Sequence, residues 1–309
     1  MQITATGRVN DILYVLGINE CPIYLVDTQK QAVIFDSGIT CLGQIYADAI
    51  RSVLDDRQPA VLFISHAHWD HCGAAVYLKR AFPAMQIAAS PLAVNILKRP
   101  NAIKLMVRLN REVPVKLAPD PGLDYSRLID EIFAPPNIDM ELQDRDVVRV
   151  GANTVVEVIA TPGHTRDHLS FYLPREKILI APESGGVMIG SGTIEPEFVA
   201  DYDSYLASLQ RLANLPAEVL CQGHYSVFTG REEVKRFLRR SLEETVGYKN
   251  RICELLRHEH GEVERVVRLI KAARYDNVEG DKQEEQSYIL NLTAQVRHLA
   301  AKFPQPIPD

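Results

Sequence analysis

Three histidines and one aspartate lie within a single six-residue segment, His66-Ala67-His68-Trp69-Asp70-His71. Imidazole nitrogens and carboxylate oxygens are ligands that zinc, iron and manganese accept in proteins. The apolar residues 61–64 before the segment predict a short buried strand, and residues 74–82 after it predict a helix. We therefore expect the segment in a turn at the carboxyl end of a strand, where open α/β sheets bind ligands. Such a turn can direct His66 and His68 to one metal ion, and Asp70 and His71 to a second ion.

The pattern His66-x-His68-x-Asp70-His71 resembles the metal-binding signature of the metallo-β-lactamase superfamily. Two later histidines, His164 in Thr-Pro-Gly-His and His224 in Gln-Gly-His, each follow a predicted strand in the order that the family shows. The resemblance assigns two sets of ligands to two divalent ions: His66, His68 and His164 to one, and Asp70, His71 and His224 to the other. It implies zinc, or iron or manganese, and no organic cofactor.

Glu183 departs from the family pattern, which usually has an aspartate at the end of this strand. The glutamate side chain is one methylene longer than that of aspartate. It could bridge both metal ions, bind one of them, or leave the second site weak. We predict that Glu183 is a metal ligand at the bridging position.

Three further residues near these motifs have open roles. Asp36 follows a predicted strand and either supports a ligand histidine or forms a helix cap or turn. His168 and Tyr225, each close in sequence to a predicted ligand, could contact a substrate. The alternatives are a hydrogen-bonding support for His168 and burial in the core for Tyr225.

The elements around these motifs predict an α/β protein. Short apolar runs predict a meander over residues 12–35, and strands recur near residues 86–89, 147–150, 155–159, 169–173 and 219–221. Residues 92–133 predict a helical insertion, residues 184–200 a loop, and residues 232–303 three amphipathic helices. The resemblance implies a four-layer αβ/βα sandwich, with a catalytic domain over residues 1–231. We expect residues 232–303 to form a helical extension packed on the core near the site.

The composition is that of an ordinary globular protein, since 46% of the 309 residues are apolar and 24% are charged. The net charge of −6 argues against nucleic-acid binding driven by charge. No signal peptide or membrane-spanning stretch is evident, and the five scattered cysteines favour a reducing, cytoplasmic location. We expect no membrane partner, and the C-terminal helices could form a homodimer.

The resemblance implies a hydrolase in which a metal-bound hydroxide, oriented by the catalytic residue Asp70, attacks an acyl carbonyl. A thiolate can leave without a general acid because thiol pKa values lie near neutrality, which favours a small acyl thioester as substrate. The C-terminal helices and residues 201–209 look similar to the alkylquinolone-pathway thioesterases, which hydrolyse 2-aminobenzoylacetyl-coenzyme A. The alternatives are a lactonase or another ester hydrolase, and a metal-binding regulatory protein with little activity.

Overall fold

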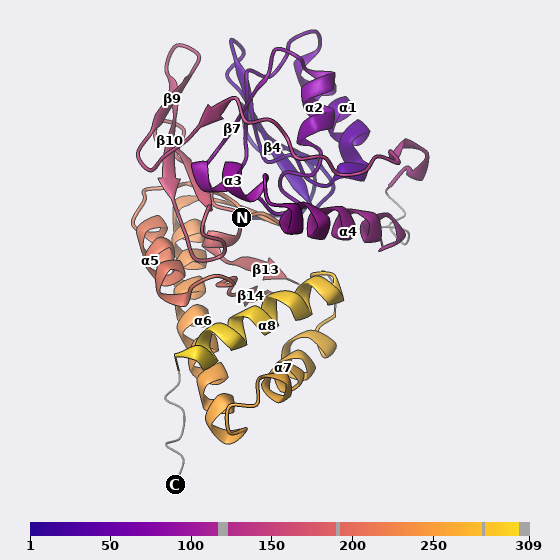
Figure 1. Cartoon of the computed structure of the whole chain (residues 1–309). Coiled ribbons are helices and arrows are strands. Elements are labelled where there is room, and N and C mark those ends of the chain that lie inside the picture. The colour runs from indigo at the N-terminus through magenta and orange to yellow at the C-terminus, as the bar shows by residue number, and fades with distance from the viewer. Residues whose placement is uncertain (117–122, 190–191, 280–281, 303–309) are drawn as a thin grey trace.

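The first half of the chain forms a mixed seven-stranded sheet in the order β2-β3-β4-β5-β6-β7-β8. The computed structural model describes residues 1–116, 123–189, 192–279 and 282–302 (Figure 1). The strands β2 to β5 form an antiparallel meander and β5 to β8 are parallel. Their bounds are Gly7–Arg8, Leu13–Gly17, Pro22–Asp27, Ala32–Phe35, Val61–Phe63, Gln86–Ala89 and Met140–Glu141.

A second seven-stranded sheet has the order β1-β16-β15-β12-β11-β10-β9. Its strands β12 and β15 are parallel, and the other neighbours are antiparallel. In chain order the strands are β1 Gln2–Ile3, β9 Val147–Val150, β10 Thr154–Ala160, β11 Leu169–Leu173, β12 Ile178–Ile180, β15 Val219–Cys221 and β16 Val227–Thr229. The carboxyl ends of β10, β12 and β15 therefore lie at the same edge of this sheet.

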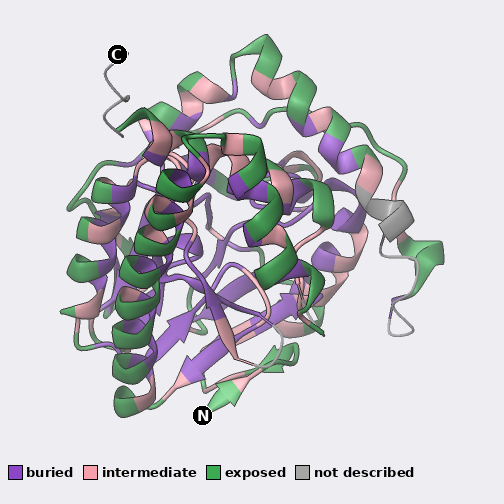
Figure 2. Cartoon of the chain, turned by 90° about the horizontal axis from the view of Figure 1, so that it is seen from below, coloured by how far each residue is buried: buried purple, intermediate pink, exposed green. Residues whose placement is uncertain are grey.

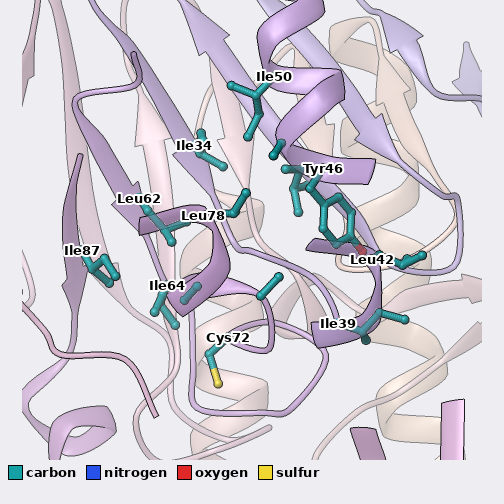
Figure 3. Packing of buried hydrophobic residues seen from close by; sticks show 14 of the residues in the cluster. Ile34, Ile39, Leu42, Tyr46, Ile50, Leu62, Ile64, Cys72, Leu78 and Ile87 are labelled. Atoms are coloured by element: carbon teal, nitrogen blue, oxygen red, sulfur yellow. The ribbon is translucent and has the colours of Figure 1, made fainter. Parts of the chain in front are cut away.

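Helices cover the outer face of each sheet, and the predicted four-layer sandwich is confirmed (Figure 1). The helices α1 (Gly43–Leu54) and α2 (Ala75–Ala81) pack on the first sheet, where Tyr46, Ile50 and Leu78 are fully buried (Figure 3). Between the sheets, the rings of Phe35, Phe63 and Phe171 pack together with centroids 5.1 to 5.3 Å apart. The central strands are buried on both faces, while the outer faces of the helices are exposed (Figure 2).

The second sheet shares one apolar core with α5 (Tyr202–Ala213) and with the C-terminal helices. These helices are α6 (Arg231–His258), α7 (Val263–Lys271), which continues as a π-helical turn over Ala272–Asp276, and α8 (Glu285–Ala301). The predicted amphipathic faces contribute Phe237, Ile252 and Leu292 to this core. Among the described residues, we find no helix that is both long and apolar enough to span a lipid bilayer.

Two connecting segments differ in detail from the sequence prediction. Within residues 92–133, the structure has α3 (Pro91–Ile96), α4 (Pro100–Lys116) and a short 3-10 turn at Tyr125–Arg127. Residues 117–122 of this predicted insertion lie outside the described residues. The predicted loop 184–200 contains the antiparallel pair β13 (Val187–Ile189) and β14 (Thr193–Glu195). Three-residue strands are too short to show an alternating pattern, so the sequence does not reveal them. In the structure, these two strands are stabilised by burial against the C-terminal helices.

Candidate metal centre

The predicted ligands come together because four strands end at one edge of the sandwich. The loop after β6 carries His66, His68, Asp70 and His71, as the sequence predicts. From the second sheet, the turn after β10 supplies His164, the 3-10 turn after β12 supplies Glu183, and the turn after β15 supplies His224. The site therefore lies between the two sheets and depends on the packing of both.

Among the residues that the structure describes, three groups of ligand atoms are compact enough to hold an ion. The first is His66, His68 and His164, the second is Asp70, His71 and His224, and the third is His66, His71 and Glu183. Within each group, the ligand atoms lie within 4.8 Å of one another. In the first group, Nε2 of His164 is 3.1 Å from Nδ1 of His68. The two metal sets inferred from the resemblance thus correspond to two compact groups, and the third group connects them through Glu183.

Four of the five histidines in the two sets have Nδ1 engaged by a neighbouring oxygen. Nδ1 of His164 lies 2.8 Å from the Glu197 carbonyl oxygen, and Nδ1 of His224 lies against the Glu20 carbonyl oxygen. Nδ1 of His66 and His71 lie close to side-chain oxygens. When Nδ1 carries the proton, Nε2 presents a lone pair, which is the form of histidine that binds a metal ion.

Asp36 connects the predicted ligands His66 and His71. Its Oδ2 is 2.8 Å from Nδ1 of His71 and accepts a hydrogen bond from the Ser65 hydroxyl at 2.9 Å. That hydroxyl in turn lies 2.9 Å from Nδ1 of His66, and Oδ1 of Asp36 accepts the Ser65 backbone N–H at 2.7 Å. Asp36 has φ +58°, a left-handed conformation that Asp and Asn tolerate better than most residues. Of its two sequence interpretations, the structure supports the ligand-supporting role.

Glu183 lies at the centre of the cluster with its carboxylate surrounded by imidazoles. Its Oε1 is 3.1 Å from Nε2 of His71 and 3.3 Å from Nε2 of His224. Its Oε2 is 3.4 Å from Nε2 of His168 and 3.7 Å from Nδ1 of His66. The extra methylene fits because Gly223 leaves room: a Cβ at that position would be 2.0 Å from Oε1. The longer side chain therefore reaches both ligand sets.

The electrostatics of the site favour a cation. Burial, with neighbouring imidazoles, lowers the pKa of His66 and His164 well below the usual range, so both rings are neutral. Burial alone would also lower the pKa of His71, but Glu183, Asp36 and Asp70 outweigh it and raise that pKa. Burial likewise opposes ionisation of Glu183, yet its imidazole neighbours hold the pKa of this carboxyl well below the usual value.

Several polar atoms in the cluster are buried and lack a hydrogen-bond partner among the described residues. They are Nε2 of His66, Nε2 of His168, Oδ1 of Asp70 and both carboxylate oxygens of Glu183, whose imidazole neighbours are close but do not meet hydrogen-bond geometry. Such atoms are costly to bury unless something compensates them. Nitrogen and carboxylate ligands grouped in this way fit divalent metal ions, zinc among them. The cluster is therefore a candidate metal centre.

His168 and Tyr225, the two candidate substrate contacts, occupy different environments. His168 is 1% exposed, lies 4.9 Å from the His66 ring centroid in a stacked arrangement, and faces Glu183. This position suits support of the ligands. Tyr225 is half-buried beside His224, with a ring centroid distance of 5.9 Å and φ +62°.

Sequence reasoning did not identify Glu197, which lies beside the site. Its Oε2 is 3.8 Å from Nδ1 of His164, and its backbone carbonyl binds the same nitrogen. Burial, followed by the nearby carboxylate of Glu183, raises the pKa of Glu197 to about 8. No spacing or motif distinguishes Glu197 in the sequence, because its place depends on the β13–β14 hairpin.

Known proteins similar to this chain share its fold or parts of its sequence. "Beta-lactamase-like protein 2 homolog" of Caenorhabditis elegans is 26% identical over 261 residues, which are 81% of this chain and 72% of that protein. "Atrochrysone carboxyl ACP thioesterase" of Aspergillus fumigatus is 24% identical over 235 residues, which are 74% of this chain and 59% of the relative. "Hydroxyacylglutathione hydrolase" of Cereibacter sphaeroides is 37% identical over 90 residues, 29% of this chain and 33% of that enzyme.

Several solved structures share the fold. An archaeal metallo-beta-lactamase superfamily protein from Sulfolobus tokodaii has a TM-score of 0.56 and 18% identity, covering 97% of both chains. A sec-alkylsulfatase from Pseudomonas sp. has a TM-score of 0.67 and 14% identity, covering 98% of this chain and 51% of that one. The family model described as "Metallo-beta-lactamase superfamily" matches residues 16–224. Since that match covers well over half of the sequence, the chain belongs to the metallo-beta-lactamase superfamily.

Proposed function

We propose that this protein is a metal-dependent hydrolase of acyl thioesters. The observation that carries the proposal is the cluster of two ligand sets around Glu183, with its orphaned buried ligand atoms. The relatives add the substrate class, because two of them are named as a hydroxyacylglutathione hydrolase and an acyl-carrier thioesterase. The narrower similarity of residues 201–209 and the C-terminal helices to alkylquinolone-pathway thioesterases suggests a coenzyme A thioester.

Seven residues would hold the two ions, namely His66, His68 and His164, then Asp70, His71 and His224, with Glu183 between the sets. When bound, divalent ions activate water at neutral pH and polarise a carbonyl oxygen. Among these residues, His68, Asp70 and His224 are partly exposed, so a substrate would approach past them. The other four are buried and keep bulk water from the rear of the site.

Asp70 would orient the attacking water. Its Oδ2 faces His71 at 4.0 Å and His224 at 3.7 Å, whereas its buried Oδ1 has no hydrogen-bond partner among the described residues. An acceptor that is not otherwise engaged can hold one proton of the water. The water oxygen then adds to the acyl carbon and the carbon–sulfur bond breaks, which releases a carboxylic acid and a thiol. The thiolate leaves without a proton donor because its pKa lies near neutrality.

The test is hydrolysis of a panel of acyl-coenzyme A thioesters, including 2-aminobenzoylacetyl-coenzyme A, and of acyl lactones by zinc-loaded protein. Thiol release and lactone opening are recorded separately. The substitutions His66→Ala and Asp70→Asn should reduce thiol release at least a hundredfold. The matched control is His258→Ala, since His258 is an exposed histidine near the end of α6 and outside the cluster.

Full activity in His66→Ala or Asp70→Asn would reject the mechanism. Lactone opening without thiol release would replace the thioesterase proposal with the lactonase alternative. A protein that binds two metal ions and is inactive on the whole panel would favour the regulatory alternative. Equal losses in His66→Ala and His258→Ala would show that the assay reports folding and would remove the support for the assignment.

A further inference from the structure

The C-terminal helices contact the same short segment that holds His164. We infer that Gln295, in the middle of α8, is a positioning residue that sets the orientation of His164 through residues 194–198, called the anchor segment below. The inference rests on the proposed metal centre but not on the identity of the substrate. Figure 1 shows the β13–β14 hairpin, which leads into the anchor segment, beside α8.

On its inner side, the anchor segment contacts two predicted ligands through Glu197. The Glu197 carbonyl oxygen accepts the hydrogen bond from Nδ1 of His164 at 2.8 Å. The Glu197 backbone N–H donates to the Tyr205 hydroxyl at 3.3 Å, and that hydroxyl donates to the Glu183 carbonyl oxygen at 2.9 Å. A shift of Glu197 would therefore move His164 directly and Glu183 through Tyr205.

On its outer side, the anchor segment is bound by the C-terminal helices. Nε2 of Gln295 donates a 2.6 Å hydrogen bond to the Pro196 carbonyl oxygen, and Oε1 of Gln295 accepts the Tyr248 hydroxyl at 3.2 Å. Arg274 donates to the Ile194 carbonyl oxygen at 3.0 Å and forms an ion pair with Glu195 at 3.2 Å. Gln295 is 4% exposed, so water cannot readily replace its amide.

The anchor segment is well suited to transmit this restraint. Pro196 has no backbone N–H and a fixed φ, which restricts the chain immediately before the carbonyl that Gln295 binds. Phe198, which is fully buried, packs against the rings of Tyr202 and Tyr248 at 5.2 and 5.9 Å. Packing therefore holds Phe198 in place. The peptide planes around Pro196 are the part of the segment whose orientation the Gln295 side chain can control.

Loss of the Gln295 amide would leave the Pro196 carbonyl buried without its donor. A buried acceptor in this state favours a rotation that finds a new partner, and Glu197 is the next residue to turn. The hydrogen bond that keeps the proton on Nδ1 of His164 would then weaken. Partners that fix the tautomer of a ligand histidine typically change metal affinity 10- to 100-fold. We expect an effect of about tenfold, because Gln295 acts through one intervening residue.

The experiment compares Gln295→Met and Gln295→Glu in the full chain. Methionine preserves the length of the side chain without polar atoms, and glutamate keeps an acceptor for Tyr248 while removing the donor to Pro196. Gln286→Met and Gln286→Glu on the exposed first turn of α8 are the matched controls. Zinc affinity is measured by competition with a chromophoric chelator, and the visible spectrum of bound Co²⁺ reports ligand geometry. Nitrogen-15 spectra of the metal-free histidine rings report the tautomer of His164.

Both Gln295 variants should bind the zinc ion of the His66, His68 and His164 set about tenfold more weakly. They should also alter the Co²⁺ spectrum and broaden the His164 Nδ1–H resonance. The Gln286 variants should match the unsubstituted chain. Unchanged zinc affinity and Co²⁺ spectrum in a folded Gln295 variant would overturn the inference, as would equal changes in the Gln286 controls. The inference would also be overturned if the substitutions lowered only the unfolding free energy of the metal-free protein. An unsubstituted chain that binds zinc but cleaves no thioester would reject the proposed substrate class and leave this test intact.

Discussion

Asp36→Asn is the substitution that most directly tests how the metal centre is supported. The Asp36 carboxylate accepts three hydrogen bonds at once, from the Ser65 backbone N–H, the Ser65 hydroxyl and Nδ1 of His71. Asparagine offers one oxygen and one NH₂ group in the same space. Whichever way the amide is turned, its NH₂ group faces at least one of these donors. The left-handed backbone at Asp36, with φ +58°, is tolerated by asparagine, so the substitution should not strain the chain.

The magnitude follows from the group that loses its acceptor. Leaving a buried donor unsatisfied costs about 1 to 3 kcal/mol. If His71 instead moves its proton to Nε2, it loses the lone pair that would bind the ion. Loss of such a supporting carboxylate typically lowers metal affinity 10- to 100-fold, which corresponds to about 1.4 to 2.7 kcal/mol. We therefore expect the ion bound by Asp70, His71 and His224 to dissociate 10 to 100 times more readily.

The assay is a zinc titration against a chromophoric chelator at neutral pH, with the number of bound ions measured after gel filtration. Asp27→Asn is a matched control, because Asp27, at the end of β4, is also a buried aspartate but forms an ion pair with Arg57 at 2.7 Å. It should lower stability without changing zinc affinity. Two zinc ions bound with unchanged affinity by a folded Asp36→Asn protein would refute the proposed role of Asp36.

Two further substitutions test other parts of the site. Gly223→Ala would place a Cβ 2.0 Å from Oε1 of Glu183, so we expect loss of one zinc ion and at least a hundredfold loss of hydrolysis. Gly247→Ala, where no atom lies within 4 Å of the added Cβ, is its control, and equal zinc content in the two variants would contradict the prediction. For Glu197, the pKa is raised from 4.5 to about 8, so the metal-free folded state binds more protons than the unfolded state between these values, and stability falls as pH rises through this range. The unfolding free energy of Glu197→Gln, measured with denaturant, should therefore rise relative to that of the unsubstituted chain from pH 5 to pH 8, by at most about 5 kcal/mol. A difference that shrinks with rising pH would refute the assignment.

The sequence predicted the parts of this protein that depend on local patterns. The run from His66 to His71 is contiguous, and the apolar residues on either side identify the strand and helix that place it in a turn. The strands that precede His164 and His224 were recognised for the same reason. The amphipathic periods of α6, α7 and α8 are long enough to distinguish a helix from a strand. The resemblance to a known family then gave the four-layer order of these elements, which the structure confirms.

The supporting contacts could not be obtained in this way, because they join residues that are distant in sequence. Asp36 reaches His71 across 35 positions, and His164 meets the Glu197 carbonyl across 33. The hairpin of β13 and β14 has strands too short for a detectable alternation, yet it carries the anchor segment. Its position is set by burial against α6 and α8, which no local pattern encodes.

Residue types and spacing, together with the resemblance to a known family, therefore indicated which side chains could bind a metal and at which strand ends they lie. Only the tertiary structure decided which nitrogen of each histidine faces the site and how Glu183 reaches both ligand sets. It also decided that Gln295, more than 100 positions from His164, contacts the segment that holds this histidine. The physical reason is that ligand identity is a property of single residues, whereas orientation, burial and tautomer depend on neighbours that folding brings together.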